Sequence, residues 1–344
     1  CTLKKFVSKN SIKNIVTNLI PYGVTRSEEK IADIISAEIF STNQLSSKIN
    51  CKLTLSQYAL QFNISFPERI ICNDVNELEK YGKLLQKKHN KIVIKAAYSS
   101  GGSGLAVVDT SEKLSTICRC IRNDTNKDGY IMIEKWYNFA TSYNHQYFIS
   151  DNGIFPYCFS QQVIKPTSGN IMGSVFNSAI GVGKRIWSKH YSMSQPILRK
   201  IQKMGYRGVI GFDSLVSMKE NVFFPVIDIN CRINLSTIFA EILSSHFYSD
   251  YSCFICREYV LSRSVPFKAL QLLLGDNAYS EESKEGIVIL NFTTLNYNIL
   301  RTKSKYGNLF FGIFAKTEYR MKELRAFVLS DAMSIKGDFN EYIE

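Results

Sequence analysis

The segment from residue 208 to residue 232 predicts a β-hairpin, and it constrains the fold more than any other segment. Two runs rich in β-branched and aromatic residues flank the polar turn Ser217–Asn221, which is typical of two antiparallel strands. Because strand side chains alternate between faces, Asp228, Asn230 and Arg232 should share one face. Oxygen ligands beside a guanidinium, opposite the Asp213 carboxylate of the first run, suit a cation that bridges phosphate oxygens. The alternative is a polar strand face with one solvated ion pair.

The rest of the chain alternates between helical and strand patterns, which predicts an α/β or α+β protein. With 344 residues and 45% hydrophobic content, two or three lobes are expected. Thr25–Glu28 is a capping box that opens a helix, and the polar stretch Ser41–Ser47 is predicted to be a linker. Further helices are predicted at 53–62, 74–88, 111–122, 195–204 and 318–329, and strands at 69–72, 91–97, 105–109, 130–134, 286–292 and 308–314.

The net charge of +12 favours anionic partners such as nucleotides or an acidic protein surface. No nucleic-acid-binding module is recognisable, so nucleic acid is not an expected partner. Neither a signal peptide nor an apolar run of membrane-spanning length is present, and the chain lacks an initial Met, so residues are expected upstream. Nine cysteines without framework spacing favour reduced thiols and a cytoplasmic location. Cys253 and Cys256 lack the second half of a zinc site and are interpreted as structural thiols.

A glycine-rich loop between the predicted strands 91–97 and 105–109 is a candidate phosphate-binding loop. Glycines allow backbone N–H groups to gather around an anion, and serine hydroxyls add donors. The alternative is a plain glycine hairpin, but Lys95, just before the loop, favours a phosphate site. The loop residues are Ser99, Ser100, Gly101, Gly102, Ser103 and Gly104.

Two other patterns imitate known sites. Asp124–Ile131 copies the first half of a calcium loop, but the twelfth position is Lys135 and Glu134 comes one residue too early, so a polar turn is preferred. Gly181–Arg185 lacks the residues of a Walker loop. The histidines form no metal or nucleophile pattern, and no nucleophile elbow is present, which disfavours a hydrolytic triad.

Taken in order, these segments resemble the ATP-grasp superfamily. The order is Lys52, then Lys95 with the glycine-rich loop, the strand end Glu134–Tyr137, then Asp213 and the run Asp228–Arg232, and it covers roughly residues 48–240. The flanks resemble the subgroup with a pre-ATP-grasp lobe, which includes peptide ligases and amino-acid–carrier-protein ligases of secondary metabolism. The fragments that carry this second resemblance are Ile20–Thr25, Ser160–Gln162, Gly173–Val175 and Gly307–Gly312.

The resemblance implies an ATP-grasp fold with three parts. Residues 1–46 would form a short, partial pre-ATP-grasp lobe. Residues 47–137 would form the small subdomain with the glycine flap, and residues 138–344 the C-terminal subdomain with the metal site.

The resemblance also implies a role for each matching residue. Lys52 and Lys95 would bind the phosphates of ATP, and the 99–104 loop would close over them. Arg232, the second catalytic residue beside Lys95, would steady the transferred phosphoryl group or the acyl phosphate. Adenine would be held by Glu134, Lys135, Trp136 and Tyr137, and Mg²⁺ would be ligated by Asp213, Asp228 and Asn230.

Two departures from the family pattern are visible. Position 228 is Asp where the family usually has Glu, and Thr141-Ser142 stands where a ribose-binding Glu is common. The function that the resemblance implies is an ADP-forming carboxylate–amine ligase that makes an amide or peptide bond through an acyl phosphate. One alternative of the same fold transfers an amino acid to the thiol of a carrier protein, for which the basic charge suits an acidic partner. The alternative from another class is a non-catalytic nucleotide-binding module, which the departures at Asp228 and Thr141 favour.

Overall fold

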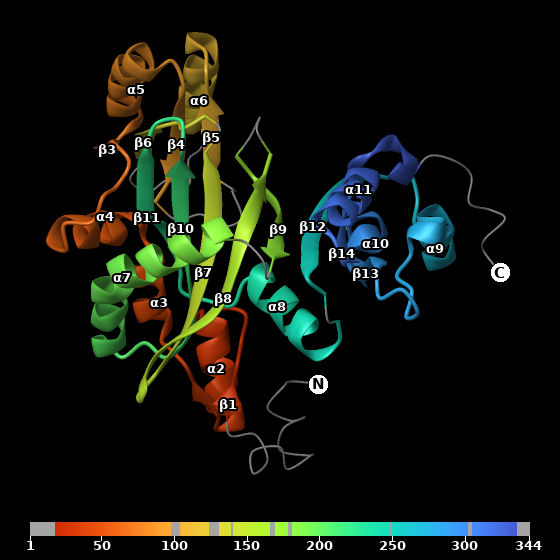
Figure 1. Ribbon diagram of the computed structural model, residues 1–344. Coiled ribbons are helices and arrows are strands. Elements are labelled where there is room, and N and C mark those ends of the chain that lie inside the picture. Colours follow the sequence, from red (N-terminus) through yellow and green to blue (C-terminus); the bar gives the residue numbers. More distant parts are fainter. Residues whose placement is uncertain are drawn as a thin grey trace. The chain divides into compact units, whose positions relative to one another are not determined.

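The protein is described by a computed structural model that covers residues 18–97, 104–123, 131–138, 140–165, 169–177, 181–247, 249–301 and 305–335. The chain divides into two compact units, which are described separately. The first comprises Cys1–Phe159, Lys165–Asn170 and Val182–Asn234; the second comprises Ser160–Ile164, Ile171–Gly181 and Leu235–Glu344. Both contain helices and strands (Figure 1), which confirms the predicted mixture of α and β structure. The predicted lobe boundaries after residues 46 and 137 stay predictions.

One part of the first unit is a small antiparallel sheet covered by two helices (Figure 1). Apolar residues on the helices, such as Leu78 and Leu114, pack with Ile94 of the sheet in one core cluster. Gly82 allows close packing, because a Cβ there would lie 3.1 Å from the Leu114 side chain. The strand order is β3 (Arg69–Cys72), β6 (Ile131–Lys135), β4 (Ile92–Ala96) and β5 (Leu105–Val108), with helices α5 (Val75–His89) and α6 (Ser111–Asn123).

The other part of the first unit is built around the predicted hairpin, which is confirmed. Asp213 faces Asp228 and Ser217 faces Val222 across the two strands, with an irregularity in register between Asp213 and Leu215. The strand order is β11 (Val222–Asn230), β10 (Gly208–Ser217), β7 (Thr141–Ser150) and β8 (Gly153–Ile164). Fully buried residues of the sheet pack with α3 (Asn43–Asn50), α4 (Lys52–Gln61) and α7 (Gly181–Lys203) in a second core cluster.

A smaller motif near the start of the described chain also belongs to the first unit. β1 (Asn18–Leu19) pairs in parallel with β2 (Glu38–Ile39), and α2 (Arg26–Ile35) lies between them in sequence. The predicted capping box is confirmed, because Thr25 and Glu28 bond reciprocally at the start of α2.

The second unit contains a run of antiparallel strands and its own core. The last part of β8 begins the strand order, followed by β9 (Ile171–Asn177), β12 (Tyr251–Val260), β14 (Tyr306–Ala315) and β13 (Gly286–Asn291). Gly307 allows α10 to approach β14, because a Cβ there would lie 2.0 Å from the Leu295 carbonyl oxygen. The helices are α8 (Leu235–Ser245), α9 (Phe267–Leu274), α10 (Thr293–Arg301), α11 (Glu318–Leu329) and the short 3₁₀ turns η2 (Gly275–Asn277) and η3 (Asp331–Met333).

Some predicted elements need correction. The stretch predicted as a linker, Ser41–Ser47, is largely α3: Thr42 caps the helix by accepting from the Leu45 N–H, and Ile49 is fully buried. Leu45 and Ile49 are four positions apart and so share one face of the helix. Packing of this face stabilises the helix although most of its residues are polar. The helix predicted at 195–204 begins at Gly181 and contains Pro196. The elements that were not predicted include β1, β2, α8, α9, α10 and β12, whereas the other predicted helices and strands are confirmed within a few residues.

Within the described ranges, no helix is both long and apolar enough to cross a membrane. The eight cysteines in this part of the chain are free thiols. Cys253 and Cys256 lie on β12, three positions apart, so their side chains leave opposite faces of the strand. That arrangement fits structural thiols better than a shared metal site.

Two histidines are buried inside the first unit. The rings of His145 on β7 and His190 on α7 stack with centroids 3.5 Å apart, and both side chains are fully buried. Tyr147 Oη lies 2.7 Å from His190 Nδ1, and Ser214 Oγ lies 3.0 Å from His145 Nε2. Burial lowers the pKa of His190 to about 3, and burial together with the neighbouring imidazole lowers the pKa of His145 well below its usual value. Both rings are therefore neutral in the folded protein near neutral pH.

We expect the free energy of unfolding to fall as pH decreases from about 6.5, the usual histidine pKa, toward about 4. In that window the unfolded chain binds protons that the folded protein does not, at a cost of about 1.4 kcal/mol per pH unit for each histidine. Urea denaturation across this pH range measures the effect. His190→Gln should reduce the slope, whereas His246→Gln, at an exposed histidine, should leave it unchanged. Equal slopes for His190→Gln and the unchanged protein would contradict the interpretation.

Candidate active site

The carboxylates of Asp213 and Asp228 face each other across the β10–β11 hairpin. Asp213 is buried and accepts hydrogen bonds at both oxygens. Asn144 Nδ2 donates to Oδ1 at 2.7 Å, and Asn230 Nδ2 donates to Oδ2 at 3.2 Å. The three predicted magnesium ligands, Asp213, Asp228 and Asn230, are therefore brought together by the hairpin register.

The facing carboxylate of Asp228 disfavours the negative charge of Asp213. Burial, and after it the negative charge of Asp228, raise the pKa of Asp213 to about 6. The amides of Asn144 and Asn230 and the positive charge of Arg232 act in the opposite direction. A cation between the carboxylates would relieve both the desolvation and the repulsion.

Lys52 lies beside this pair. It begins α4, its side chain is almost fully buried, and its Nζ is 3.3 Å from Asp228 Oδ2. Its backbone N–H donates to the carbonyl oxygen of Ala97, at the end of the strand that carries Lys95, at 3.3 Å. The predicted phosphate-binding ammonium thus contacts a predicted metal ligand from a distant part of the sequence.

Arg232 continues the same polar face beyond the end of β11. Its Nη2 donates to Asn230 Oδ1 at 2.8 Å, and its Nη1 donates to Tyr22 Oη at 3.1 Å. The guanidinium carbon is 5.4 Å from the centre of the Tyr22 ring. The Ile233 N–H also donates to the Tyr22 carbonyl oxygen at 2.9 Å, which ties this tyrosine to the end of the hairpin. Tyr22 was not predicted as a site residue.

A second group of charged side chains surrounds Glu134 on β6. Lys95 Nζ donates to Glu134 Oε2 at 2.5 Å, and Arg69 Nε donates to Oε1 at 2.6 Å. All three side chains are buried or nearly so. Burial by itself would raise the pKa of Glu134, but the positive charges of Lys95 and Arg69 outweigh it and hold that pKa below its usual value. Glu134 is therefore a carboxylate bound by two cations.

Arg69 connects the two predicted phosphate-binding lysines. Besides Glu134, it donates from Nη1 to the carbonyl oxygen of Lys52 at 3.1 Å. Its guanidinium lies over the Phe66 ring, 4.2 Å from the centre. Arg69 thus fixes the backbone that carries Lys52 and the carboxylate that holds Lys95. Sequence reasoning included it only as part of a strand, because no local pattern distinguishes it.

The remaining residues predicted to hold adenine, Lys135, Trp136 and Tyr137, follow Glu134 at the end of β6. Lys135 forms an ion pair with Glu220, and its Nζ is 4.6 Å from the centre of the Tyr137 ring. Tyr137 packs edge-on against Phe224, with centroids 5.2 Å apart. The backbone N–H of Trp136 donates to the carbonyl oxygen of Lys91 at 3.1 Å. These contacts hold the segment in place, and its role in binding adenine stays a prediction.

The glycine-rich loop is described only through its flanks. Ser99, Ser100, Gly101, Gly102 and Ser103 lie outside the described residues, as does the calcium-like segment Asp124–Gly129. On either side, β4 and β5 pair antiparallel with Lys95 opposite Leu105, and the Ala96 N–H donates to the Gly104 carbonyl oxygen at 2.9 Å. Gly104 has φ of 72°, which favours glycine. The prediction that the loop joins two strands is confirmed.

Sequence reasoning also missed a row of polar residues on β7. Gln146 Nε2 donates to Asn144 Oδ1 and to Asn234 Oδ1, both at 2.8 Å. Gly211 lies opposite, and a Cβ there would come within 3.2 Å of the Asn144 and Asn234 amides. The alternation of Ser142, Asn144 and Gln146 along one strand was the signal that could have revealed this row.

The buried position of Ser142 bears on one of the departures from the family pattern. Ser142 Oγ donates to the Ser214 carbonyl oxygen at 3.2 Å, and its side chain is largely removed from solvent. The hydroxyl thus stabilises the pairing of β7 with β10, and the pair Thr141-Ser142 does not present a carboxylate to a ribose.

Comparisons with known proteins point to one superfamily. A family model described as L-aspartate–L-methionine ligase, ATP grasp, matches residues 67–230. The [butirosin acyl-carrier protein]–L-glutamate ligase of Niallia circulans is 29% identical over 210 residues, which are 60% of this chain and 47% of that protein. The chain thus spans about half the length of the relative that it matches.

Solved structures share the fold at low sequence identity. A biotin carboxylase–ATP complex from Campylobacter jejuni has a TM-score of 0.63 and 11% identity, covering 95% of this chain and 77% of that chain. The N5-carboxyaminoimidazole synthase of Aspergillus clavatus, with ADP and 5-aminoimidazole ribonucleotide, has a TM-score of 0.60 and 14% identity, covering 93% and 83%. The chain therefore has the ATP-grasp fold. This shared fold and the family model over residues 67–230 confirm the resemblance to the ATP-grasp superfamily seen in the sequence.

We expect Glu134→Gln to destabilise the first unit strongly. The change keeps the shape but leaves Arg69 and Lys95 buried without their counter-charge, and breaking a buried ion pair in this way costs about 3–5 kcal/mol. Urea denaturation measures the loss. Glu68→Gln is a matched control, because Glu68 pairs with Lys88 and His89 at the surface and should contribute much less. Similar losses for the two variants would show that the buried carboxylate has no special role.

Proposed function

We propose that this chain is an ATP-dependent ligase that activates a small carboxylate, such as that of an amino acid, and joins it to an amine. The reaction forms an amide bond and releases ADP and phosphate. The observation that supports it best is the contact of Lys52 Nζ with Asp228, 3.3 Å apart, beside the facing Asp213 carboxylate. A buried ammonium next to two carboxylates suits a phosphate chain bound together with a divalent cation.

The residues present fit Mg²⁺. Asp213 and Asp228 supply hard oxygen ligands from facing strand positions, and the raised pKa of Asp213 reflects charge that a cation would balance. Asn230 at present points its amide nitrogen at Asp213 and its oxygen at Arg232, so it would join the ligands only after a rotation of the amide. When bound there, Mg²⁺ would neutralise charge on the β- and γ-phosphates.

In the first step, an oxygen of the substrate carboxylate attacks the γ-phosphorus of ATP. The bond from that phosphorus to the β–γ bridging oxygen breaks, which gives ADP and an acyl phosphate. We assign Lys52 and Lys95 to the phosphates and Arg232 to the transferred phosphoryl group. Arg69 and Glu134 are positioning residues, because they hold Lys95 and the Lys52 backbone in place.

In the second step, the amine attacks the acyl carbon, loses a proton, and displaces phosphate. The mixed anhydride must be kept from water during this step. In the sequence, the glycine-rich segment Ser99–Ser103 connects β4 to β5, which pair with each other. We propose that it closes over the phosphates, and that Glu134–Tyr137 holds the adenine.

A second candidate has the same first step but a different acceptor. The Niallia circulans relative is named as a ligase of L-glutamate with an acyl-carrier protein, and the net charge of +12 suits an acidic carrier. In this case the thiol of a carrier would displace phosphate and form a thioester. The non-catalytic alternative predicts Mg-ATP binding without turnover.

We expect incubation with Mg-ATP, amino acids and candidate acceptors to release ADP and phosphate in equal amounts. Mass spectrometry of the products separates the acceptors, because an amide resists hydroxylamine whereas a thioester is cleaved by it. Release of AMP would contradict the acyl-phosphate route. Binding of Mg-ATP by calorimetry without any ADP release would support the non-catalytic alternative instead.

We expect Asp228→Asn to lower the rate of ADP formation by more than about 100-fold, because a metal ion contributes several kcal/mol of charge stabilisation. The amide keeps the size of the side chain but removes the negative charge. Asp151→Asn is a matched control, because Asp151 is exposed and pairs with Arg207. Full activity of Asp228→Asn would show that the metal assignment is wrong.

A further inference from the structure

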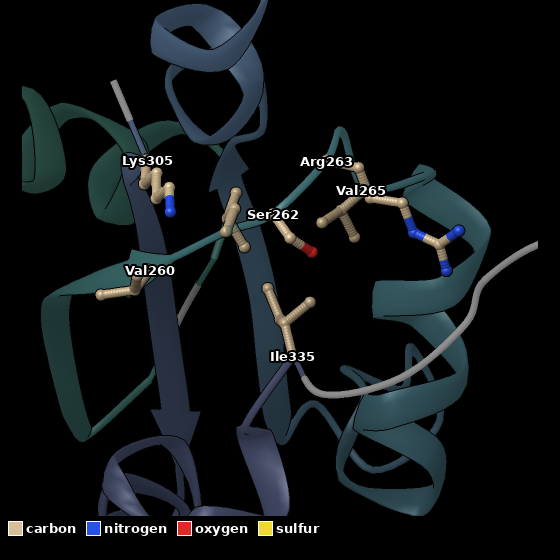
Figure 2. A pocket seen from close by; sticks show the side chains of 7 residues that line it. Val260, Ser262, Arg263, Val265, Lys305 and Ile335 are labelled. Carbon is tan, nitrogen blue, oxygen red and sulfur yellow. The ribbon is translucent and has the colours of Figure 1, made fainter. Parts of the chain in front are cut away.

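A pocket in the second unit does not bring its polar side chains together. It has a volume of about 230 Å³ and lies where β12 ends, next to the start of β14. Figure 2 shows the Arg263 guanidinium pointing away from Lys305 and Ser262. These groups therefore offer no common binding point, and the pocket supports no assignment. The polar row on β7 of the first unit, by contrast, is connected by hydrogen bonds.

This row belongs to a pattern that crosses three neighbouring strands. Asp213 of β10 lies opposite Asn144 of β7. Two positions earlier on β10, Gly211 lies opposite Gln146 of β7 on one side and Asn230 of β11 on the other. Side chains two positions apart on a strand share a face. The metal ligands proposed above therefore occupy one face of the sheet together with the amides of Asn144 and Gln146.

The direction of the Asn144 amide is fixed by its partners. Its Nδ2 donates to Asp213 Oδ1 at 2.7 Å, so its own oxygen faces away from the carboxylate. There the oxygen accepts from Gln146 Nε2 at 2.8 Å and from Asn234 Nδ2 at 3.4 Å. A rotated amide would set its oxygen against the carboxylate oxygen and its NH₂ group against these two NH₂ groups. Hydrogen bonds at both ends therefore hold the Asn144 amide in one orientation.

Gln146 lies at the centre of this network. Its side chain is fully buried, and its Nε2 donates to Asn234 Oδ1 at 2.8 Å as well as to Asn144. Gly211 provides the space, because a Cβ there would lie 3.1 Å from Asn234 Nδ2 and 3.2 Å from Asn144 Nδ2. The buried amides are therefore closely packed as well as hydrogen-bonded, which restricts their rotation.

The second amide at Asp213 is held differently. Asn230 Nδ2 donates to Asp213 Oδ2 at the longer distance of 3.2 Å, and the Asn230 oxygen accepts from Arg232 Nη2. Asn230 is partly exposed, and the metal assignment above requires its amide to rotate. Asn144 is then the amide that keeps Asp213 in place while Asn230 changes partners.

We propose that Gln146 is a positioning residue for the cation site and that it acts through Asn144. By fixing the direction of the Asn144 amide, Gln146 fixes the orientation of the Asp213 carboxylate before a cation binds. Partners that hold a metal ligand in this way strengthen metal binding, and their loss typically weakens it about 10-fold to 100-fold. The inference rests on the proposed function, through the assignment of Asp213 to Mg²⁺.

Calorimetry of the full chain tests this role with two ligands, Mn-ADP and ADP in the presence of EDTA. Mn²⁺ prefers the same oxygen ligands as Mg²⁺, and the ratio of the two affinities measures what the cation contributes. We expect Gln146→Met to lower this ratio about tenfold or more, because Met has a similar size but cannot donate to Asn144. Gln57→Met, at an exposed glutamine of α4, is the matched control and should leave the ratio unchanged.

Two further variants separate this role from a general effect on packing. In an Asn144→Ala background, Gln146→Met should not lower the ratio again, because the route through Asn144 is already lost. Gly211→Ala should lower the ratio by crowding both amides without removing a hydrogen-bonding group. Circular dichroism checks that each variant folds, and Gly211→Ala carries the test if Gln146→Met does not fold. A purely structural Gln146 would contribute to the free energy of unfolding but not to the ratio.

An unchanged ratio in folded Gln146→Met, or in Gly211→Ala if only that variant folds, would overturn the proposal. So would a further loss in the Asn144→Ala background as large as the loss in the unchanged protein. Asp228→Asn distinguishes this failure from failure of the proposed function. If Asp228→Asn abolishes the contribution of the cation but Gln146→Met keeps it, only the positioning role is wrong. If the unchanged protein binds Mn-ADP no more tightly than ADP, the metal assignment is wrong and the positioning role is wrong with it.

Discussion

The first unit depends on how it compensates a buried negative charge. A carboxylate as completely buried as Glu134 would be strongly destabilising on its own. Arg69 and Lys95 bind its two oxygens from two different strands, and the same Arg69 also binds the Lys52 backbone. The charge balance therefore sets the relative positions of the two lysines that we assign to the ATP phosphates. Removing one member would disturb stability and the geometry of the site together.

Unlike Glu134, the two carboxylates of the hairpin have charges that are only partly compensated. Asp213 and Asp228 face each other, and Asn144, Asn230 and Lys52 satisfy their oxygens without removing the repulsion. The raised pKa of Asp213 is the physical sign of this imbalance. The charge of Glu134 is therefore neutralised by Arg69 and Lys95. The charges of Asp213 and Asp228 are not fully neutralised, so a bound cation would stabilise this pair. This difference is what separates a positioning residue from a proposed metal ligand.

Sequence patterns revealed the elements and residues that act through local spacing. The hairpin 208–232 and the capping box at Thr25 could be predicted, because turn residues and strand alternation lie within a few positions. Arg69 and Tyr22 could not, because their roles arise from contacts with Glu134 and Arg232 far along the chain. The roles of the individual site residues stay predictions.

The error at α3 and the elements missed in the second unit have one cause. Polar residues such as Ser46 and Asn43 suggested a linker, but packing of Ile49 into the core stabilises a helix there. In the second unit, α9 is so apolar that helical periodicity is masked, while α10 is mixed in composition. Packing against the rest of the protein determines the secondary structure of these segments, and a single sequence contains little information about such packing.

The Asp at position 228 does not by itself argue for a degenerate site. Facing residues of an antiparallel pair have Cβ atoms about 4.5–5.5 Å apart, so two aspartates at such positions could both bind one cation. A glutamate would carry its carboxylate one methylene further from the strand. The shorter side chain is matched here by a partner that is also Asp, and by Lys52 at 3.3 Å on its other side. If the proposed metal assignment holds, Asp213 and Asp228 would bind the cation together, and Asn144 on the next strand would orient Asp213.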